Sequence, residues 1–295
     1  MNFIKRKYYQ LYVSFLKVTN ANEICISKAK YFLKNGKRLN LDNPTDFMDK
    51  IQWLKFYYYT ENYGHLVDKF AVRSFVEQKI GSKYLNDFIG IYNDVDSIDF
   101  DKLPNQFALK ATHGSGYNII VADKSKLNFR NVKKQLNKYL RQDYSKTNQE
   151  AIYRNIKPRI LAEKYLQQSE ANNIIDYKFF CFHGCAKFVW VKTLHNGKYK
   201  NCYYDLNWNK IKEDSNTSNY LDIDMEKPEN LDEMINISNQ LASELIFVRV
   251  DLYSIKNQIY FGELTFFPWG GKQRLTVEYF NVHFGKLINL PLKPE

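Results

Sequence analysis

Hydrophobic residues recur at helical spacing through residues 1–90. Residues 45–60 give the clearest case, because an apolar residue returns every three or four positions and would lie on one helix face. Asp46, or the threonine before it, could cap the start of this helix. Residues 26–41 and 66–85 repeat the pattern, and Gly81 is expected to end the helix in the second range. The sequence therefore predicts a mainly helical N-terminal region.

From about residue 90 the pattern changes to short β-type runs separated by polar or glycine-containing turns. These runs lie within residues 88–93, 105–124, 158–166, 176–194, 200–208 and 245–267. Helical stretches at 131–144 and 229–245 lie between them. Because strands and helices interleave without a regular βαβ period, the sequence predicts an α+β fold rather than a doubly wound parallel sheet.

The composition indicates a soluble, basic protein. The 295 residues include 43 Lys and Arg against 32 Asp and Glu, a net charge of +11. No uncharged apolar run approaches the roughly 18 residues of a membrane span, and a lysine interrupts the first apolar stretch, which argues against a signal peptide. We therefore expect a cytoplasmic protein whose four cysteines are reduced core thiols rather than disulfides or zinc ligands.

The positive charge restricts the class of partner. The 23 Tyr and 21 Phe fall mostly in apolar segments, where they are expected to pack in the core, so we do not expect nucleic acid as a partner. An anionic polysaccharide, a nucleotide or anionic lipid headgroups would explain the charge equally well. Binding to anionic lipid headgroups would place the protein peripherally at the inner face of a membrane. The sequence does not indicate an oligomeric state.

Two carboxylates are predicted on neighbouring strands near the end of the chain. The runs IFVRVDLY and QIYFGELTFF flank SIKN and would pair as a hairpin, with Asp251 and Glu263 on adjacent strands among apolar neighbours. Burying both is costly unless a cation lies between them, and an oxygen-rich site suits Mg²⁺. Arg249 would share a face with Asp251 and could bind a phosphate. The alternative is a pair of solvent-facing carboxylates with a surface ion pair.

Two further segments carry candidate binding residues. Residues 107–121 predict a strand, the turn His113-Gly114-Ser115-Gly116 and a second strand. Amides of this turn could bind a phosphate beside Lys110, although the turn fits neither a P-loop nor a Rossmann motif and an ordinary hairpin remains the alternative. Residues 158–167 predict an apolar strand ending at Glu163, whose backbone could bind an adenine edge.

These three segments, in this order, resemble the ATP-grasp superfamily. That family has a lysine strand with a glycine-rich loop, an E-[KE]-[YF]-[LIV] hinge, and an R-x-D strand followed by E-x-N. The corresponding stretches here are ALKATHGSG, AEKYL, RVD and GELT, with Thr265 in place of Asn. NPTDFMDKIQWLK, LVDKFAVRSFVEQKIG and DYKFFCFHG further resemble the TupA-like branch, which is associated with bacterial surface polysaccharides and teichuronopeptides. The resemblance runs from about residue 40 to residue 290.

The resemblance implies an ATP-grasp fold, in which two α+β lobes hold a nucleotide between them. The ATP-grasp domain would cover residues 91–295, after the helical region 1–90. Its smaller lobe would lie at about 100–162 and its larger lobe at about 163–290.

The resemblance also implies ATP and Mg²⁺ as cofactors and gives roles to individual residues. Arg249 and Lys110 would be catalytic, acting on the transferred phosphoryl group and the phosphates. The residues expected to bind the nucleotide are Lys69, Lys110, His113, Gly114, Ser115, Gly116, Glu163, Lys164, Tyr165, Leu166, Asp176 and Lys178. The residues expected to hold magnesium are Asp251, Glu263 and Thr265. The residues expected at the acceptor-binding loop are Gly270, Gly271 and Lys272.

The function that this resemblance implies is that of a carboxylate–amine ligase acting through an acyl phosphate. Its partners would be a small-molecule or glycan carboxylate, such as a uronic acid of a bacterial surface polysaccharide, and an amine. A glycosyltransferase of a capsule or O-antigen pathway that uses a sugar nucleotide is the alternative, and the sequence DID at residues 222–224 has the form of its metal motif. A non-catalytic basic binding module is a third reading.

Overall fold

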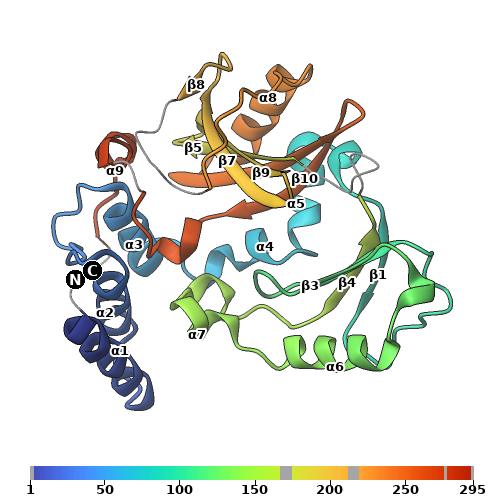
Figure 1. Ribbon diagram of the computed structural model, residues 1–295, viewed down its shortest axis with the longest axis horizontal. Coiled ribbons are helices and arrows are strands. Elements are labelled where there is room, and N and C mark those ends of the chain that lie inside the picture. Colours follow the sequence, from blue (N-terminus) through green and yellow to red (C-terminus); the bar gives the residue numbers. More distant parts are fainter. Residues whose placement is uncertain (1–2, 167–174, 212–218, 276–277, 294–295) are drawn as a thin grey trace.

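A four-stranded antiparallel sheet forms the smaller part of the computed structural model, which describes residues 3–166, 175–211, 219–275 and 278–293 (Figure 1). Its strand order is β1 (Phe88–Tyr92), β4 (Ile160–Lys164), β2 (Phe107–Ala111) and β3 (Asn118–Val121). Helix α6 (Phe129–Leu140) packs Val132 and Leu136 against this sheet. Phe107, Leu109 and Ile160 lie in the same core because alternate residues of a strand share a face.

A six-stranded antiparallel sheet forms the larger part. Its strand order is β10 (Gln258–Thr265), β9 (Phe247–Ile255), β5 (Asp176–Phe182), β6 (Cys185–His195), β7 (Lys198–Asp205) and β8 (Lys210–Ile211). Helix α8 (Leu231–Ala242) covers one face. On the other face, α3 (Phe47–Tyr57) and α9 (Glu278–Lys286) bring Phe47 within 5.2 Å of Phe247 and Phe284 within 4.0 Å of Phe188 between ring centroids.

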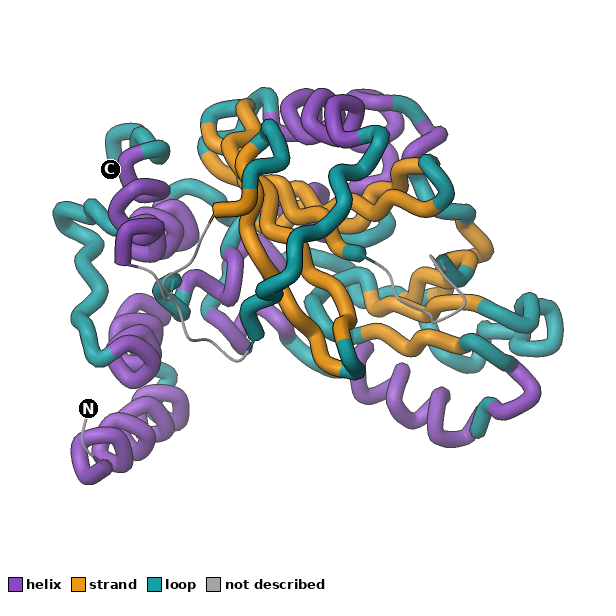
Figure 2. The backbone as a smooth tube through the Cα atoms, turned by 45° about the horizontal axis from the view of Figure 1, so that its top comes forward, coloured by secondary structure: helices purple, strands orange, loops and turns teal. Residues whose placement is uncertain are grey.

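The remaining helices are short or lie at the edge of the molecule (Figures 1 and 2). The α-helices among them are α1 (Phe3–Val18), α2 (Glu23–Asn35), α4 (Gly64–Val67), α5 (Val72–Ile80) and α7 (Tyr144–Asn148). The 3₁₀ turns are η1 (Glu61–Tyr63), η2 (Ser82–Tyr84), η3 (Lys124–Lys126), η4 (Ala151–Tyr153) and η5 (Pro268–Gly271). Across the described ranges, no helix has the length and apolar character needed to cross a bilayer.

The predicted helix over residues 66–85 is wrong in its continuity. The carboxylate of Asp68 accepts hydrogen bonds from the backbone N–H groups of Phe70 and Ala71, at 2.8 and 3.2 Å. This local turn competes with helical bonding and separates α4 from α5. The α5 helix then ends at Ile80, directly before the glycine that the pattern predicted as its stop, and Gly81 adopts φ of +96°.

Two further expectations need correction. Asp46 precedes α3 but does not cap it through its side chain, because its carboxylate pairs with Lys37 at 2.7 Å and Arg274 at 2.8 Å. Cysteines 181 and 202 are buried free thiols as expected, whereas Cys25 and Cys185 are exposed. Cys25 lies on the solvent side of α2, and Cys185 follows the turn between β5 and β6.

The α+β architecture with a helical start is confirmed. Helix α3 is buried along most of its length, from Phe47 to Lys55, and shares one hydrophobic core with the larger sheet. Helices α1 and α2 form a small separate core of Val13, Leu16, Ile26 and Ala29, while Tyr31 of α2 lies in the main core. A domain boundary at residue 90 stays a prediction, although the core places α3 with the larger sheet.

Candidate active site

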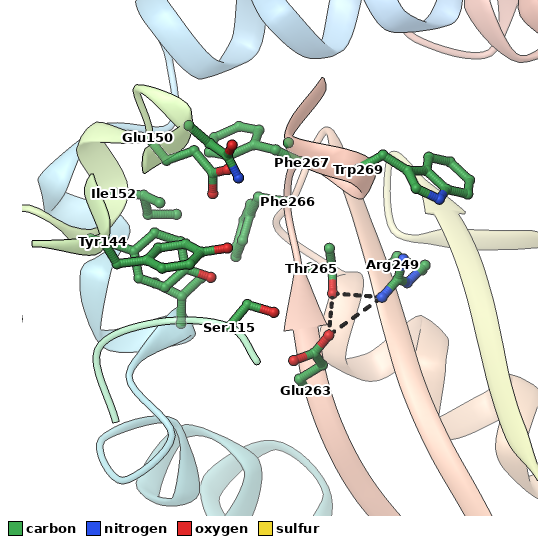
Figure 3. Close-up of a pocket in the computed structure, with 14 residues that line it drawn as sticks. Ser115, Tyr144, Glu150, Ile152, Arg249, Glu263, Thr265, Phe266, Phe267 and Trp269 are labelled. Atoms are coloured by element: carbon green, nitrogen blue, oxygen red, sulfur yellow. Dashed lines mark hydrogen bonds and ion pairs between the residues drawn. The ribbon is translucent and has the colours of Figure 1, made fainter. Parts of the chain in front are cut away.

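A cluster of charged residues lies on strands β10, β9 and β5, at one edge of the larger sheet. Glu263 of β10 is directly opposite Asp251 of β9. The guanidinium of Arg249 donates to both carboxylate oxygens of Asp251, at 2.6 and 2.7 Å, to Thr265 Oγ1 at 3.0 Å and to Glu263 Oε1 at 3.4 Å (Figure 3). Lys178 of β5 donates to Asp251 at 2.5 Å. Four residues expected from the sequence are therefore in direct contact with Arg249 or with its partner.

The burial of Asp251 is compensated by these cations. Its side chain is 2% exposed, and burial alone would raise its pKa, but Arg249 and Lys178 outweigh burial and lower it. Asp176 lies 3.5 Å from Lys178, and its pKa is raised by burial. The two cations that pair with Asp251 thus come from the protein itself. The sequence left open a surface ion pair between Arg249 and Asp251, but this ion pair is buried.

Glu263 differs from Asp251 in being accessible. Its side chain is 41% exposed, and it lines both cavities described below. Thr265 Oγ1 donates to its Oε1 at 2.9 Å. In the parts of the chain that the structure describes, no group of three or more His, Cys, Asp or Glu could hold a metal ion. Any ion here would therefore depend on Glu263, on a rearranged Asp251 and on ligands from outside the protein.

The first cavity, of about 90 Å³, lies between the two sheets. It is lined by Lys110 of β2 and Glu163 of β4, which form an ion pair at 2.6 Å, and by Arg73 of α5, which lies 3.3 Å from Glu163. Lys69 also lines it, from the break between α4 and α5. Three cations and two carboxylates, Glu163 and Glu263, therefore surround one small space.

In the described part of the chain, the glycine-containing turn after β2 contacts the first cavity only through Lys69. Lys69 Nζ donates to the carbonyl of Gly114, and burial lowers the pKa of Lys69. Ser115 hydrogen-bonds with Tyr144 and lines the second cavity. His113 is instead buried against α6, with Nε2 at 3.1 Å from the carbonyl of Tyr139, and burial lowers its pKa.

The hinge after β4 contributes less than the sequence suggested. Leu166 lines the first cavity. The backbone of Lys164 is already engaged, because its N–H donates to the carbonyl of Asp87 and its carbonyl accepts from Asn86. Its ammonium pairs with Asp87 at 3.0 Å, and Tyr165 is not among the residues that line the first cavity. The predicted nucleotide contacts of these two residues stay predictions.

The second cavity, of about 220 Å³, lies beside Arg249 and Glu263 (Figure 3). Aromatic side chains make up much of its wall. They are Tyr144, Tyr153, Phe266, Phe267 and Trp269. Gly270 lines it as well, whereas Gly271 accepts a hydrogen bond from Gln52 and Lys272 donates to Asn148. The predicted acceptor loop is therefore next to this cavity.

Glu150 was missed by sequence reasoning. It follows α7, is buried, and directs its carboxylate into the second cavity, across from Arg249 (Figure 3). Asn148 provides a side-chain hydrogen bond, and Lys55 and Lys272 add positive charge around it, while burial raises its pKa. Burial lowers the pKa of Lys55 to about 7. A glutamate in a polar stretch carries no local signal of burial, so the sequence could not have identified it.

The chain belongs to the TupA-like ATP-grasp family, whose profile matches residues 49–289. This confirms the resemblance and the ATP-grasp fold inferred from the three segments. A search among curated proteins gives no match. Helices α1 and α2 precede the matched residues.

Several solved ligases are similar in structure. D-alanine–D-alanine ligase from Bacillus anthracis, complexed with ATP, has 16% identity and a TM-score of 0.38, with 68% of this chain and 54% of that chain covered. The same enzyme from Helicobacter pylori has 14% identity and a TM-score of 0.40, with 76% and 61% covered. N5-carboxyaminoimidazole synthetase from Staphylococcus aureus has 10% identity and a TM-score of 0.40, with 77% and 53% covered.

The chain thus spans between about half and three fifths of the length of these three proteins. With TM-scores below 0.5, these likenesses carry no argument of their own. The family match carries the assignment.

Proposed function

We propose that this protein is an ATP- and Mg²⁺-dependent carboxylate–amine ligase that acts through an acyl phosphate. The observation that carries the proposal is that two cavities meet at Glu263, one lined by Lys69 and Lys110 and the other by Arg249. The first has cations for a nucleotide's phosphates, and the second has room for the group that receives the phosphoryl. Membership of the TupA-like ATP-grasp family supports the same chemistry.

The charged side chains would act by binding and orienting. Lys110 and Lys69 would bind phosphate oxygens, since each ammonium already lies at the first cavity. Glu163 would hold Lys110 in place and face the adenosine, as the family resemblance implies. Arg249 would stabilise the negative charge of the transferring phosphoryl group, because its fork is fixed by Asp251.

Magnesium would supply charge neutralisation between phosphate oxygens. Glu263 fits this role because its carboxylate is accessible from both cavities. Mg²⁺ usually takes one or two carboxylates and completes its shell with phosphates and water. Thr265 would orient Glu263 through the bond at 2.9 Å. Asp251 would bind the ion only by giving up its ion pair with Lys178 or Arg249. We therefore assign to Asp251 first the role of holding Arg249 in place.

The second cavity would receive the acceptor carboxylate and the amine. The carboxylate would lie near Arg249, where the phosphoryl group arrives. The amine would enter as an ammonium at Glu150, whose carboxylate faces the cavity from the opposite side. It would lose a proton to water before its nitrogen attacks the acyl phosphate, and phosphate would leave as the amide bond forms. The aromatic wall favours a cation further, because ring faces attract positive charge.

The acceptor in this proposal is a uronic acid carboxyl of a bacterial surface polysaccharide, and the reaction takes place in the cytoplasm. The TupA-like family link and the net charge of +11 support a polyanionic acceptor. The residues that the glycosyltransferase alternative would use, at positions 222–224, lie outside both cavities. Asp224 is exposed and pairs with Lys210 at 3.5 Å, and neither it nor Asp222 lines either cavity.

A thermal-shift panel tests the proposal. ATP with Mg²⁺ should raise the melting temperature by several degrees at a concentration of about 100 times the dissociation constant, whereas UDP-glucose and UDP-glucuronate should not. Adding D-glucuronate and hydroxylamine to ATP and Mg²⁺ should then release ADP and form a hydroxamate. Stabilisation by UDP-sugars alone would replace the ligase with the transferase.

A further inference from the structure

Helix α1 presents a row of exposed apolar side chains. Ile4, Tyr8, Leu11, Phe15 and Val18 are spaced alternately by four and three residues, so they form one stripe along the helix. Each is between 61% and 82% exposed. The opposite face of α1 is already used, because Val13 and Leu16 pack on Ile26 and Ala29 of α2. The stripe is therefore a second apolar face that no described residue covers.

The charges around the stripe have one sign. Residues 1–22 contain no Asp or Glu and include Lys5, Arg6, Lys7 and Lys17. A helix with aromatic and aliphatic residues on one side and lysine or arginine on its polar face is typical of helices that lie in the interface of an anionic membrane. Each basic residue near such a surface adds to binding.

The same charges oppose pairing with a second copy of the helix. Two stripes packed face to face would bring Lys7 of both chains to the contact, because Lys7 lies beside Ile4 and Leu11 at helical spacing, without a carboxylate from either helix. Helix pairs of that kind gain specificity from opposite charges at flanking positions. The charge pattern therefore favours a lipid surface over self-association.

The helix is attached to the side of the molecule that holds the second cavity. Lys30 of α2 donates to Gln149 Oε1 at 2.8 Å, next to Glu150. Asn35 at the end of α2 donates to the carbonyl of Lys272 at 2.7 Å, just after η5. Figure 1 shows α1 at the outer edge of the molecule, next to α2.

We propose that the outer face of α1 binds the surface of an anionic lipid bilayer and thereby holds the second cavity close to the membrane. The family match does not include this helix, so the inference is independent of the ligase chemistry.

Vesicle co-sedimentation without nucleotide tests the inference. The probes are vesicles of phosphatidylcholine alone and of phosphatidylcholine with one quarter phosphatidylglycerol, at 100 mM salt. Wild type should bind the anionic vesicles at least about tenfold more tightly than the neutral ones. The triple variant Ile4→Gln, Leu11→Gln, Phe15→Gln should weaken this binding by at least about tenfold, since glutamine keeps the helix but removes the apolar stripe.

Two further variants keep the test decisive. Lys5→Gln, Arg6→Gln, Lys7→Gln should also weaken binding by about tenfold or more while leaving the stripe intact. The matched control Tyr199→Gln, Ile223→Gln, Leu292→Gln removes three exposed apolar residues elsewhere and should bind as wild type does. Stabilisation by ATP and Mg²⁺, measured in parallel, reports on folding and on the nucleotide site separately.

Three outcomes would overturn the inference. Wild type could fail to bind anionic vesicles, or the stripe variant could bind them as well as wild type does. Light scattering on a sizing column could instead show a wild-type dimer that the stripe variant converts to a monomer without any vesicle binding, which would assign the stripe to a second copy.

Discussion

The two cavities that meet at Glu263 are built from different kinds of side chain. The first is enclosed by ion-paired groups, with Glu163 between Lys110 and Arg73. The second has aromatic walls, with Arg249 at one side and Glu150 at the other. Charged pairs suit a ligand of fixed chemistry such as a triphosphate, whereas an aromatic space with separated charges can accommodate two different substrates. The difference suggests which variants should affect nucleotide binding and which should affect the other substrates.

Arg249→Lys should have the largest effect. Lysine keeps the charge but loses the fork that contacts Asp251, Thr265 and, in our proposal, the phosphoryl group. We expect kcat for ADP release with D-glucuronate and hydroxylamine to fall by about 100- to 1000-fold. The control is Arg154→Lys, which alters a half-exposed ion pair with Glu23. A kcat within threefold of wild type would remove Arg249 from the chemistry.

Lys110→Ala should mainly affect the nucleotide. We expect the affinity for a non-hydrolysable ATP analogue with Mg²⁺, measured by calorimetry, to fall by about 10- to 100-fold, because a charge-assisted contact to phosphate is lost. Glu163 keeps Arg73 as a partner in this variant, so folding should survive. Lys133→Ala on α6 removes a lysine that pairs with the exposed Asp96 and should bind as wild type. Equal affinities for the two variants would contradict the assignment.

Glu150→Gln should discriminate between amines. We expect the KM for ethanolamine, which enters as an ammonium, to rise about tenfold, since one charge-assisted contact is lost. The KM for neutral hydroxylamine and the affinity for the ATP analogue should stay within about twofold, because neither needs this carboxylate. If both amines were affected alike, Glu150 would act only in packing the lysines near it.

Gly270→Ala offers a steric version of the same test. Gly270 has φ of +64°, and an added Cβ would lie 3.0 Å from the side chain of Asn148 and 3.3 Å from Glu150 Oε1. Gly197 has φ of +71°, and a Cβ there would meet nothing within 4 Å. Both alanine variants carry similar backbone strain, but only Gly270→Ala should raise the KM for ethanolamine, by several-fold. Equal kinetics in the two variants would separate Gly270 from the amine.

The pH dependence of stability should reveal the lowered pKa of the buried Lys55. Burial lowers the folded-state pKa of Lys55 from 10.5 to about 7, and the charge of Glu150 offsets this only in part. Between pH 7 and 10.5 the unfolded chain therefore binds one more proton at Lys55 than the folded chain does. The free energy of unfolding consequently rises with pH across this range. Between pH 7 and 9 we expect Lys55 to contribute about 1–3 kcal/mol to this rise in the free energy of unfolding. Lys55→Met should flatten it in urea titrations, whereas Lys133→Met should not. An unchanged slope would show that Lys55 is not desolvated.

The charged strands of the site could be predicted from sequence because their signals are local. Alternation along β9 put Arg249 and Asp251 on one face, and the SIKN turn paired Asp251 with Glu263. The partners of these charges could not be predicted in the same way. Lys178 meets Asp251 from a strand 73 positions away, a contact that no local pattern in the sequence signals.

The sequence by itself determined most of the elements, the α+β class and the family, since hydrophobic period, turn residues and short motifs act over a few positions. Only the tertiary structure decided which polar groups became buried together. Glu150, Lys55 and Lys272 lie far apart in the chain and meet because α3, α7 and η5 pack side by side. Their burial, and so their altered pKa values, arises from that packing and has no local counterpart in the sequence.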